Sequence, residues 1–210
     1  MIPDALLGLW ERESVTLEGA PGLPEGPFEA ARVRWFQARS YYADLRIPHG
    51  AAAPFAEEEA FGGRQRFRAP RLRFLHELDR SGRLGDDEGE LAWDGAALLE
   101  SGSFEFAGRA CRYRERWVRR SRPDPALTVH TLHAEDGALA GLCVQVDDAR
   151  LLLRSVNGFV AAREERFGPT GPETVAALDD AGPGPEDRTA EWQCVEGVPG
   201  VLATPVHGRP

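Results

Sequence analysis

Residues 91–119 read LAWDGAALLESGSFEFAGRACRYRERWVR, and this stretch decides the fold class. Apolar and polar residues alternate along most of it, and the dipeptide Asp94-Gly95 and then Gly108 interrupt the alternation. Alternation with a period of two is typical of a half-buried β-strand, and Asp-Gly accepts the positive φ angles of a tight hairpin. The stretch therefore predicts three antiparallel strands joined by short turns, at Gly89–Trp93, Ala97–Phe106 and Arg109–Arg119.

The same pattern continues on both sides of this stretch. Asp136-Gly137 and Asn157-Gly158 each lie between alternating segments and predict two further tight hairpins. About ten strands in sequence order, joined mainly by short turns, predict an all-β fold, an antiparallel up-and-down β-barrel. A sandwich of two sheets stays open, because hairpin signals alone do not prove closure. The other strands are expected at Gly8–Leu17, Ala31–Gln37, Ser40–Pro48, Arg71–Asp79, Leu127–His133, Ala138–Val146, Arg150–Val156 and Gly158–Glu164.

Helix is expected at one or two short places only. Pro54–Phe61 (PFAEEEAF) is a candidate helix between two strands, where it would suit a lid at the barrel mouth, and Glu173–Leu178 is a candidate helical turn. The chain around residues 168–189 is rich in Gly, Pro and acidic residues, a composition typical of a mobile segment. We therefore expect a barrel domain over residues 1–167, a flexible segment over 168–190, and a tail over 191–210 that can dock on the barrel.

The composition excludes several classes of function. No apolar run approaches the roughly 18 residues of a membrane helix, and the N-terminus lacks the pattern of a secretory signal, so we expect a cytoplasmic protein. The net charge of -9 argues against nucleic-acid and membrane partners. All 25 basic residues are arginine, which is typical of a GC-rich bacterial genome. The absence of lysine excludes Schiff-base chemistry and a P-loop phosphate site.

Metal and cofactor chemistry is not expected either. Cys111, Cys143 and Cys194 are too few and too scattered for a disulfide framework or a zinc site. His130 and His133 are three residues apart on a predicted strand, so they face opposite sides and cannot share a metal ion.

The N-terminal segment Leu6-Leu7-Gly8-Leu9-Trp10 opens the first predicted strand. Gly-x-Trp on such a strand, followed by a β-meander, resembles the signature of the calycin superfamily, which contains the lipocalins. The resemblance implies that Trp10 closes the bottom of the barrel and that an arginine from the end of the last barrel strand packs over it. Arg163 is the first candidate for that arginine, and Arg154 is the second.

Three further segments resemble a group of uncharacterised bacterial and fungal lipocalin-like proteins. They are Tyr42–Pro48 (YADLRIP), His76–Asp79 (HELD) and Tyr113–Trp117 (YRERW). The resemblance spans about residues 5–165 and implies that the barrel binds a small molecule. The Thr-Asp-Tyr motif, the signal peptide and the disulfide of secreted lipocalins are missing, so it does not imply extracellular transport.

The strand Arg109–Arg119 carries one carboxylate in an apolar face. Its three alternate arginines share a face that belongs in solvent, so Tyr113, Glu115 and Trp117 should point inward. A buried carboxylate is costly unless it is paired, and burial raises its pKa. Glu115 therefore either pairs with an arginine and braces two strands, or serves a cavity.

Polar groups also occupy candidate inward positions on three other strands. Tyr42, Asp44 and Arg46 alternate with an apolar row, and this polar row faces either solvent or a cavity. His76 lies in an apolar face of its strand, and we expect Asp79 on the opposite face, in solvent. Glu100 shares a face with Leu98, so Glu100 and Glu115 are a hypothetical carboxylate pair.

These positions support three hypotheses. The first is a barrel that binds a small, partly apolar ligand. The second is an isomerase, cyclase or lyase without a cofactor, with Glu115 or His76 as the acid or base. The third is a filled barrel that acts as an interaction module. The candidate ligand-binding residues are Tyr42, Asp44, Arg46, His76, Glu100, Tyr113, Glu115 and Trp117.

Overall fold

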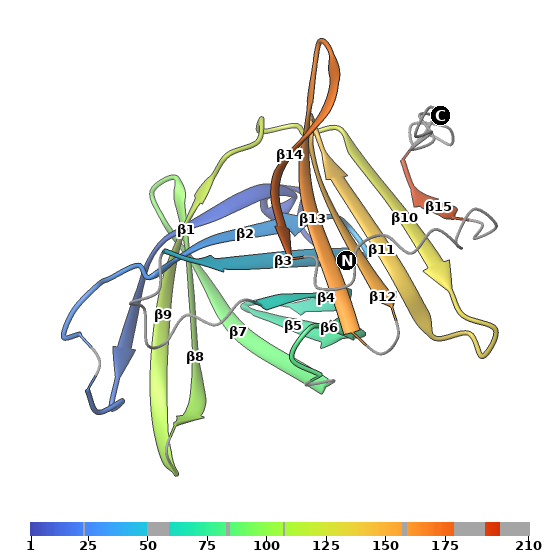
Figure 1. The fold of residues 1–210 in the computed structure, drawn as a ribbon. Helices are drawn as coiled ribbons and strands as arrows, with labels where there is room; N and C mark the ends of the chain where they lie inside the picture. Colours follow the sequence, from blue (N-terminus) through green and yellow to red (C-terminus); the bar gives the residue numbers. More distant parts are fainter. Residues whose placement is uncertain are drawn as a thin grey trace.

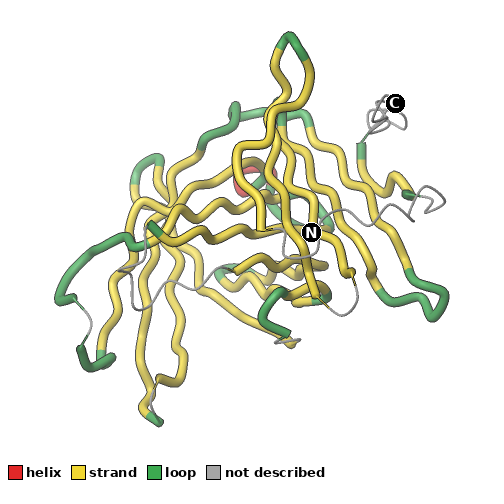
Figure 2. The backbone as a smooth tube through the Cα atoms, viewed as in Figure 1, coloured by secondary structure: helices red, strands yellow, loops and turns green. Residues whose placement is uncertain are grey.

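The structure is a computed structural model that describes residues 1–22, 24–49, 59–82, 85–106, 108–156, 159–178 and 192–197. These residues are almost all in β-strands, and the only helical element among them is the 3-10 turn η1 (Asp4–Leu6) (Figures 1 and 2). None of the described helical structure has the length and apolar character of a membrane span.

The strands follow one another with short connections. They are β1 (Gly8–Glu18), β2 (Ala31–Gln37), β3 (Tyr41–Pro48), β4 (Glu59–Arg68), β5 (Arg71–His76), β6 (Leu78–Asp79), β7 (Gly85–Asp94), β8 (Ala97–Phe106), β9 (Arg109–Arg119), β10 (Leu127–His133), β11 (Leu139–Val146), β12 (Ala149–Val156), β13 (Phe159–Gly168), β14 (Gly171–Leu178) and β15 (Gln193–Glu196).

Eight of these strands close into an antiparallel up-and-down barrel, in the order β1-β2-β3-β4-β5-β7-β8-β9, with β9 pairing back to β1. The short strand β6 lies beside β4. The predicted all-β class and the antiparallel barrel are therefore confirmed, with eight strands in the ring rather than about ten. At the hairpin between β7 and β8, Asp94 pairs with Ala97, so Gly95 and Ala96 form the turn and Gly95 adopts a φ of 62°.

The remaining strands form a separate sheet, in the order β14-β13-β12-β11-β10-β15. Strands β11, β12 and β13 lie against the outside of β2, β3 and β4, so the two sheets make two layers (Figure 1). The barrel thus ends at Arg119, and the expected barrel over residues 1–167 is corrected. The physical reason is that β1 pairs with β9 from Trp10 and Arg119 through to Glu18 and Arg112, which leaves later strands no open barrel edge.

The predicted helices are not found among the described residues. Residues 54–58 and the turn residues 157–158 lie outside the described residues, and Glu59–Phe61 belong to β4. The predicted turn at Glu173–Leu178 is wrong, because this segment is part of β14, where β-branched Thr174 and Val175 favour an extended chain.

The C-terminal regions differ partly from the expectation. Residues 171–178 of the expected flexible segment form β14, and residues 179–190 lie outside the described residues. In the tail, β15 pairs with β10 of the second sheet rather than with a barrel strand. Glu196 of β15 also accepts hydrogen bonds from the backbone N–H groups of Arg39, at 3.0 and 3.1 Å, and of Ser40, at 3.3 Å, in the turn between β2 and β3.

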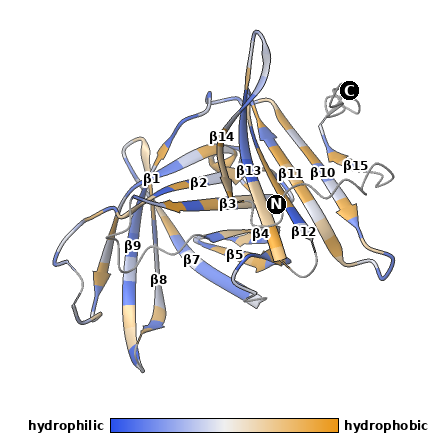
Figure 3. Cartoon of the chain, in the orientation of Figure 1, coloured by the Kyte–Doolittle hydropathy of each residue, from blue (hydrophilic) through white to orange (hydrophobic). Residues whose placement is uncertain are grey.

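Strands β2, β3 and β4 have two buried faces, one toward the barrel interior and one toward the second sheet. Their side chains alternate between these faces, and Figure 3 shows the change of hydropathy along the strands. On β3, Ala43 and Leu45 face outward into an apolar layer that includes Leu142 and Leu153 of the second sheet. The opposite face of β3 points into the barrel. This arrangement explains how an all-apolar row and a polar row can both be buried on one strand.

Candidate functional site: the barrel interior

Aromatic side chains close one end of the barrel. We call Trp10, Trp35, Phe74 and Trp117 the aromatic floor. The ring centroids of Trp35 and Trp117 are 5.5 Å apart, and those of Trp35 and Phe74 are 5.7 Å apart, both in edge-to-face geometry. Trp10 is fully buried and donates its indole N–H to the carbonyl of Leu6 in η1, at 2.8 Å. The floor is thus a packed apolar base.

Arg119 covers the floor from below. Its guanidinium lies 4.6 Å from the ring centroid of Trp10 and donates to the carbonyl oxygens of Leu7, at 2.7 Å, and of Ala5. The prediction that Arg163 fills this role is wrong, because Arg163 lies in the second sheet and pairs with Glu165 at 2.9 Å. The resemblance implies an arginine at the end of the last barrel strand. Arg119 holds that position, because it ends β9, the strand that closes the ring.

A β-bulge in β1 sets which of its side chains enter the barrel. Arg12 lies opposite Trp117 and Val15 lies opposite Glu115, and the register shifts between Arg12 and Ser14. One extra residue, the exposed Glu13, is therefore accommodated, and both Arg12 and Val15 face inward.

Glu115 is paired. Arg12 donates to Glu115 from one nitrogen and to Glu29 from two others, at 2.8 and 3.0 Å. The pair joins β9 to β1 and to the segment before β2. Of the two possibilities that the sequence left open for Glu115, the structure therefore contains the ion pair that braces neighbouring strands.

The polar row of β3 faces the barrel interior, above the floor. Asp44 accepts a hydrogen bond from Arg46 at 3.0 Å, and Arg46 also lies 3.5 Å from Glu59 and 4.9 Å from the ring centroid of Phe61. Burial raises the pKa of Asp44 to about 6, although Arg46 acts to lower it. The side chain of Arg46 stays 27% exposed. This layer is therefore polar and reachable by solvent.

Glu100 and Glu115 lie directly opposite each other on β8 and β9. Glu100 accepts a hydrogen bond from the hydroxyl of Tyr113, at 3.3 Å. Two inward glycines make room for these side chains: a Cβ at Gly89 would lie 2.5 Å from the Glu100 carboxylate, and one at Gly102 would lie 2.6 Å from the Tyr113 ring. Burial, then the charges of Glu115 and Asp87, raise the pKa of Glu100 well above its usual range and favour its neutral form.

His76 forms a hydrogen-bonded pair with Asp79, with 2.9 Å between Nδ1 and the carboxylate. The sequence expectation that Asp79 faces solvent on the opposite side is wrong, because β5 ends at His76 and a bend at Glu77 breaks the alternation before β6. The His76 ring stacks on Phe61 with centroids 4.5 Å apart, and its Nε2 is buried without a hydrogen-bond partner. Burial acts to raise the pKa of Asp79, but hydrogen bonds from His76 and Ser81 lower it overall.

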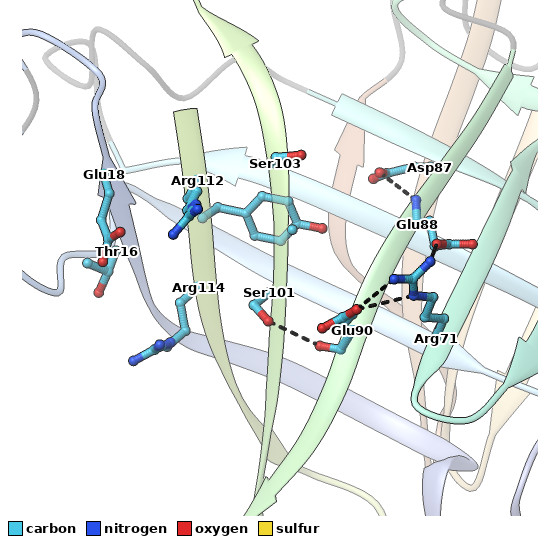
Figure 4. A pocket seen from close by; sticks show the side chains of 12 residues that line it. Thr16, Glu18, Arg71, Asp87, Glu88, Glu90, Ser101, Ser103, Arg112 and Arg114 are labelled. Carbon is cyan, nitrogen blue, oxygen red and sulfur yellow. Dashed lines mark hydrogen bonds and ion pairs between the residues drawn. The ribbon is translucent and has the colours of Figure 1, made fainter. Parts of the chain in front are cut away.

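A trough of about 670 Å³ is lined mostly by outward residues of the same barrel strands, and the inward residues Asp87, Gly102 and Tyr113 also line it. Figure 4 shows Arg112 and Arg114 on one side of it and Glu90 and Arg71 on the other. Arg71 pairs with Glu90 at 3.0 Å, and Arg112 and Arg114 are exposed, as the sequence predicted for this face. The trough is therefore mostly hydrophilic, whereas the barrel interior combines apolar and buried polar groups.

The structure brings most of the candidate residues together. Tyr42, Asp44, Arg46, His76, Glu100, Tyr113, Glu115 and Trp117 all occupy inward positions on barrel strands. Sequence reasoning missed Arg12, Glu29, Asp79, Asp87 and Arg119. The signal that could have found Arg12 is the change of parity between Trp10 and the later apolar residues Val15 and Leu17, which indicates one extra residue between them and leaves Arg12 on the face of Trp10. Among the described residues, no three His, Cys, Asp or Glu side chains lie close enough together to hold a metal ion.

Comparisons with protein-family models, with curated proteins and with solved structures found no match for this chain, so the barrel interior has to be interpreted from its own geometry.

Proposed function

We propose that the protein binds a small, partly apolar molecule inside its barrel. The observation that carries this proposal is the layering of the interior: a sealed aromatic floor lies beneath a polar layer in which Arg46 remains 27% exposed. Ligand sites typically have apolar walls and a few fixed polar groups that orient the ligand. Small barrels of about eight strands can hold one such ligand.

We further propose that the barrel is lipocalin-like. Three features support this: the closed eight-stranded meander, the Gly8-x-Trp10 start of β1, and Arg119 over Trp10 at the end of the last barrel strand. They are the features that the resemblance implied. The bound molecule would then contact the aromatic floor with its apolar part and the polar layer with its remaining groups.

Native mass spectrometry of the protein purified from its own host tests the binding proposal. We expect a protein mass increased by one small molecule, and a thermal shift when that molecule is added back to the stripped protein. Repeated recovery of bare protein, together with no thermal shift from a broad metabolite library, would contradict the binding proposal.

A second candidate function is proton transfer without a cofactor, which one observation favours. Glu100 lies directly opposite Glu115, and burial raises its pKa, so its carboxyl group is a candidate proton donor to a bound molecule. Incubation of the recovered ligand with the protein in deuterated water tests this. Deuterium in the ligand that appears with the wild type and not with Glu100→Gln would support catalysis, and an unlabelled ligand would leave binding alone.

A further inference from the structure

The barrel interior holds more acid than base. Above the aromatic floor, and apart from the hydrogen-bonded pair His76–Asp79, inward strand positions carry five carboxyl groups and two guanidinium groups, and Glu29 adds a sixth carboxyl from the segment before β2. The strand residues are Asp44, Glu59, Asp87, Glu100 and Glu115 against Arg12 and Arg46. Both guanidiniums are already engaged, Arg12 by Glu29 and Glu115 and Arg46 by Asp44 and Glu59.

Glu100 is the buried member of this set that no cation compensates. Only 5% of the residue is exposed, and the described residues place no arginine or histidine nitrogen within ion-pair distance of its carboxyl. The groups whose charges act on it are Glu115, Asp87 and Asp44, which disfavour its ionisation, and Arg46, which favours it. A buried carboxyl without a countercharge is costly to ionise, so it is held as the neutral acid.

A second, independent observation points to the same place. Tyr42 is 1% exposed, and its hydroxyl has no hydrogen-bond partner. Burial first, and then the charges of Asp44 and Asp87, raise the pKa of Tyr42 well above its usual range. Tyr42 packs against Phe74, Phe74 pairs with Asp87 of β7, and Gly89 on the same face of β7 adjoins the Glu100 carboxylate, so the unpartnered hydroxyl belongs to the same polar layer. Buried hydroxyls are normally hydrogen-bonded, and this one is free to accept or donate a bond to a ligand.

Aromatic faces surround this layer. Tyr42 packs against Phe61, with centroids 6.3 Å apart, and against Phe74, at 4.8 Å. Tyr113 contributes a further ring above Gly102. Carboxylates combined with aromatic faces are the groups that attract an organic ammonium ion, by charge and by cation–π contact.

We propose that the barrel ligand carries a cationic amine, and that its ammonium group lies in the polar layer between the Glu100 carboxyl and the Tyr42 hydroxyl. This inference rests on the proposed function. Binding replaces the proton of Glu100 by the ligand's positive charge: the O–H bond of the carboxyl breaks, the electron pair stays on oxygen, and the proton is released to solvent. The apolar part of the amine faces the aromatic floor.

Three probes with one skeleton test the proposal by isothermal titration calorimetry: 2-naphthylethylammonium, the neutral 2-naphthylethanol, and 2-naphthylacetate. We expect the amine to bind at least about tenfold more tightly than the alcohol, which corresponds to about 1.4 kcal/mol, and the carboxylate to bind most weakly. The enthalpy of amine binding should change with the ionisation enthalpy of the buffer, because a proton is released.

Two variants locate the effect. Glu100→Gln keeps the shape of the neutral acid, and it should abolish both the preference for the amine and the buffer dependence of the enthalpy. Tyr42→Phe should weaken amine binding and leave alcohol binding unchanged. Glu90→Gln is the matched control, because Glu90 lies on the outer face of β7 and is exposed; it should bind all three probes as the wild type does.

The outcomes separate the two proposals. Equal or tighter binding of the alcohol or the carboxylate would overturn the amine inference and leave ligand binding intact. Amine binding that survives unchanged in Glu100→Gln would also overturn it. If no probe binds and the protein from its host is bare, both proposals fall.

Discussion

Two buried carboxyl groups in this molecule, Glu164 and Glu100, have opposite surroundings. Glu164 lies between the two sheets, is fully buried, and has Arg32 at 3.0 Å and Arg34 at 3.3 Å. Glu100 lies inside the barrel, and no arginine of the described residues lies within ion-pair distance of its carboxyl group. Burial demands compensation in both places. Two arginines supply the countercharge of Glu164, and the resulting ion pairs hold the two layers together. Glu100 has no such countercharge among the described residues, so its carboxyl group needs a proton or a positively charged ligand.

The largest effect should come from removing the compensated carboxylate. Glu164→Gln leaves Arg32 without its partner and Arg34 with Glu11 alone, at 3.0 Å, and should lower the free energy of unfolding by about 3 kcal/mol. Urea denaturation measures this. Glu173→Gln on β14 is the control, because Glu173 is exposed and its substitution should change stability by less than about 0.5 kcal/mol. A loss of under about 1 kcal/mol for Glu164→Gln would contradict the comparison.

The second prediction concerns the pH dependence of stability. Burial raises the pKa of Asp44 in the folded state to about 6, above its value of about 3.9 in an unfolded chain. The folded protein therefore holds the proton more tightly, and stability should fall as the pH rises from about 4 to about 6.5, by roughly 2–3 kcal/mol. Asp44→Asn should remove this part of the slope. Denaturation curves at several pH values check it, and parallel slopes for the two proteins would refute it.

Substitutions at two glycines compare the packing between the two sheets with the packing inside the barrel. A Cβ at Gly62, which faces the second sheet, would lie 2.7 Å from the carbonyl oxygen of Tyr42 and 2.8 Å from Leu153. Because that oxygen is fixed backbone, Gly62→Ala should cost about 2 kcal/mol. A Cβ at Gly89 would meet only the flexible side chain of Glu100, so Gly89→Ala should cost less than about 1 kcal/mol. Thermal denaturation of both variants measures the order, and a reversed order would show that the interior is the tighter layer.

The smallest effect is expected at the sealed end of the barrel. Arg119→Lys keeps the charge but loses the planar contact with Trp10 and one of two carbonyl contacts, and should cost about 0.5–1 kcal/mol. Arg112→Lys, at an exposed position of the same strand, is the control and should leave the unfolding free energy within about 0.5 kcal/mol of wild type. If the unfolding free energies of Arg119→Lys and this control are equal, the contact of Arg119 with Trp10 does not stabilise the fold.

The positions of the strands could be predicted from the sequence better than the choice of strands that close the barrel. Alternation located β7, β8 and β9 and the inward face of Glu115, because side-chain direction in a strand depends only on parity. It did not locate the end of the barrel, because closure depends on the pairing of β1 with β9 across about a hundred residues. The wrong prediction of Arg163 has the same cause: Gly158–Glu164 is predicted as the last barrel strand, whereas β9 closes the ring and ends at Arg119.

The polar row of β3 illustrates a second limit. Tyr42, Asp44 and Arg46 could not be oriented from the sequence, because a second sheet that covers the outside of β3 leaves no strand face in solvent. The pair His76 and Asp79 was missed because one bend at Glu77 reverses the parity. In both cases a contact between distant segments, or a single irregular residue, overrides a local pattern.

The bulge at Glu13 has a consequence for recognising relatives of this protein. It sets the inward positions of β1 at 10, 12, 15 and 17 instead of 10, 12, 14 and 16. Deleting that one residue would restore the regular two-residue alternation of the strand and leave Trp10, Arg12, Val15 and Leu17 all facing into the barrel. A homologue with the same interior can therefore have either the bulge or a first strand that is one residue shorter, so an alignment of relatives has to allow a one-residue gap between the tryptophan and the distal half of the strand.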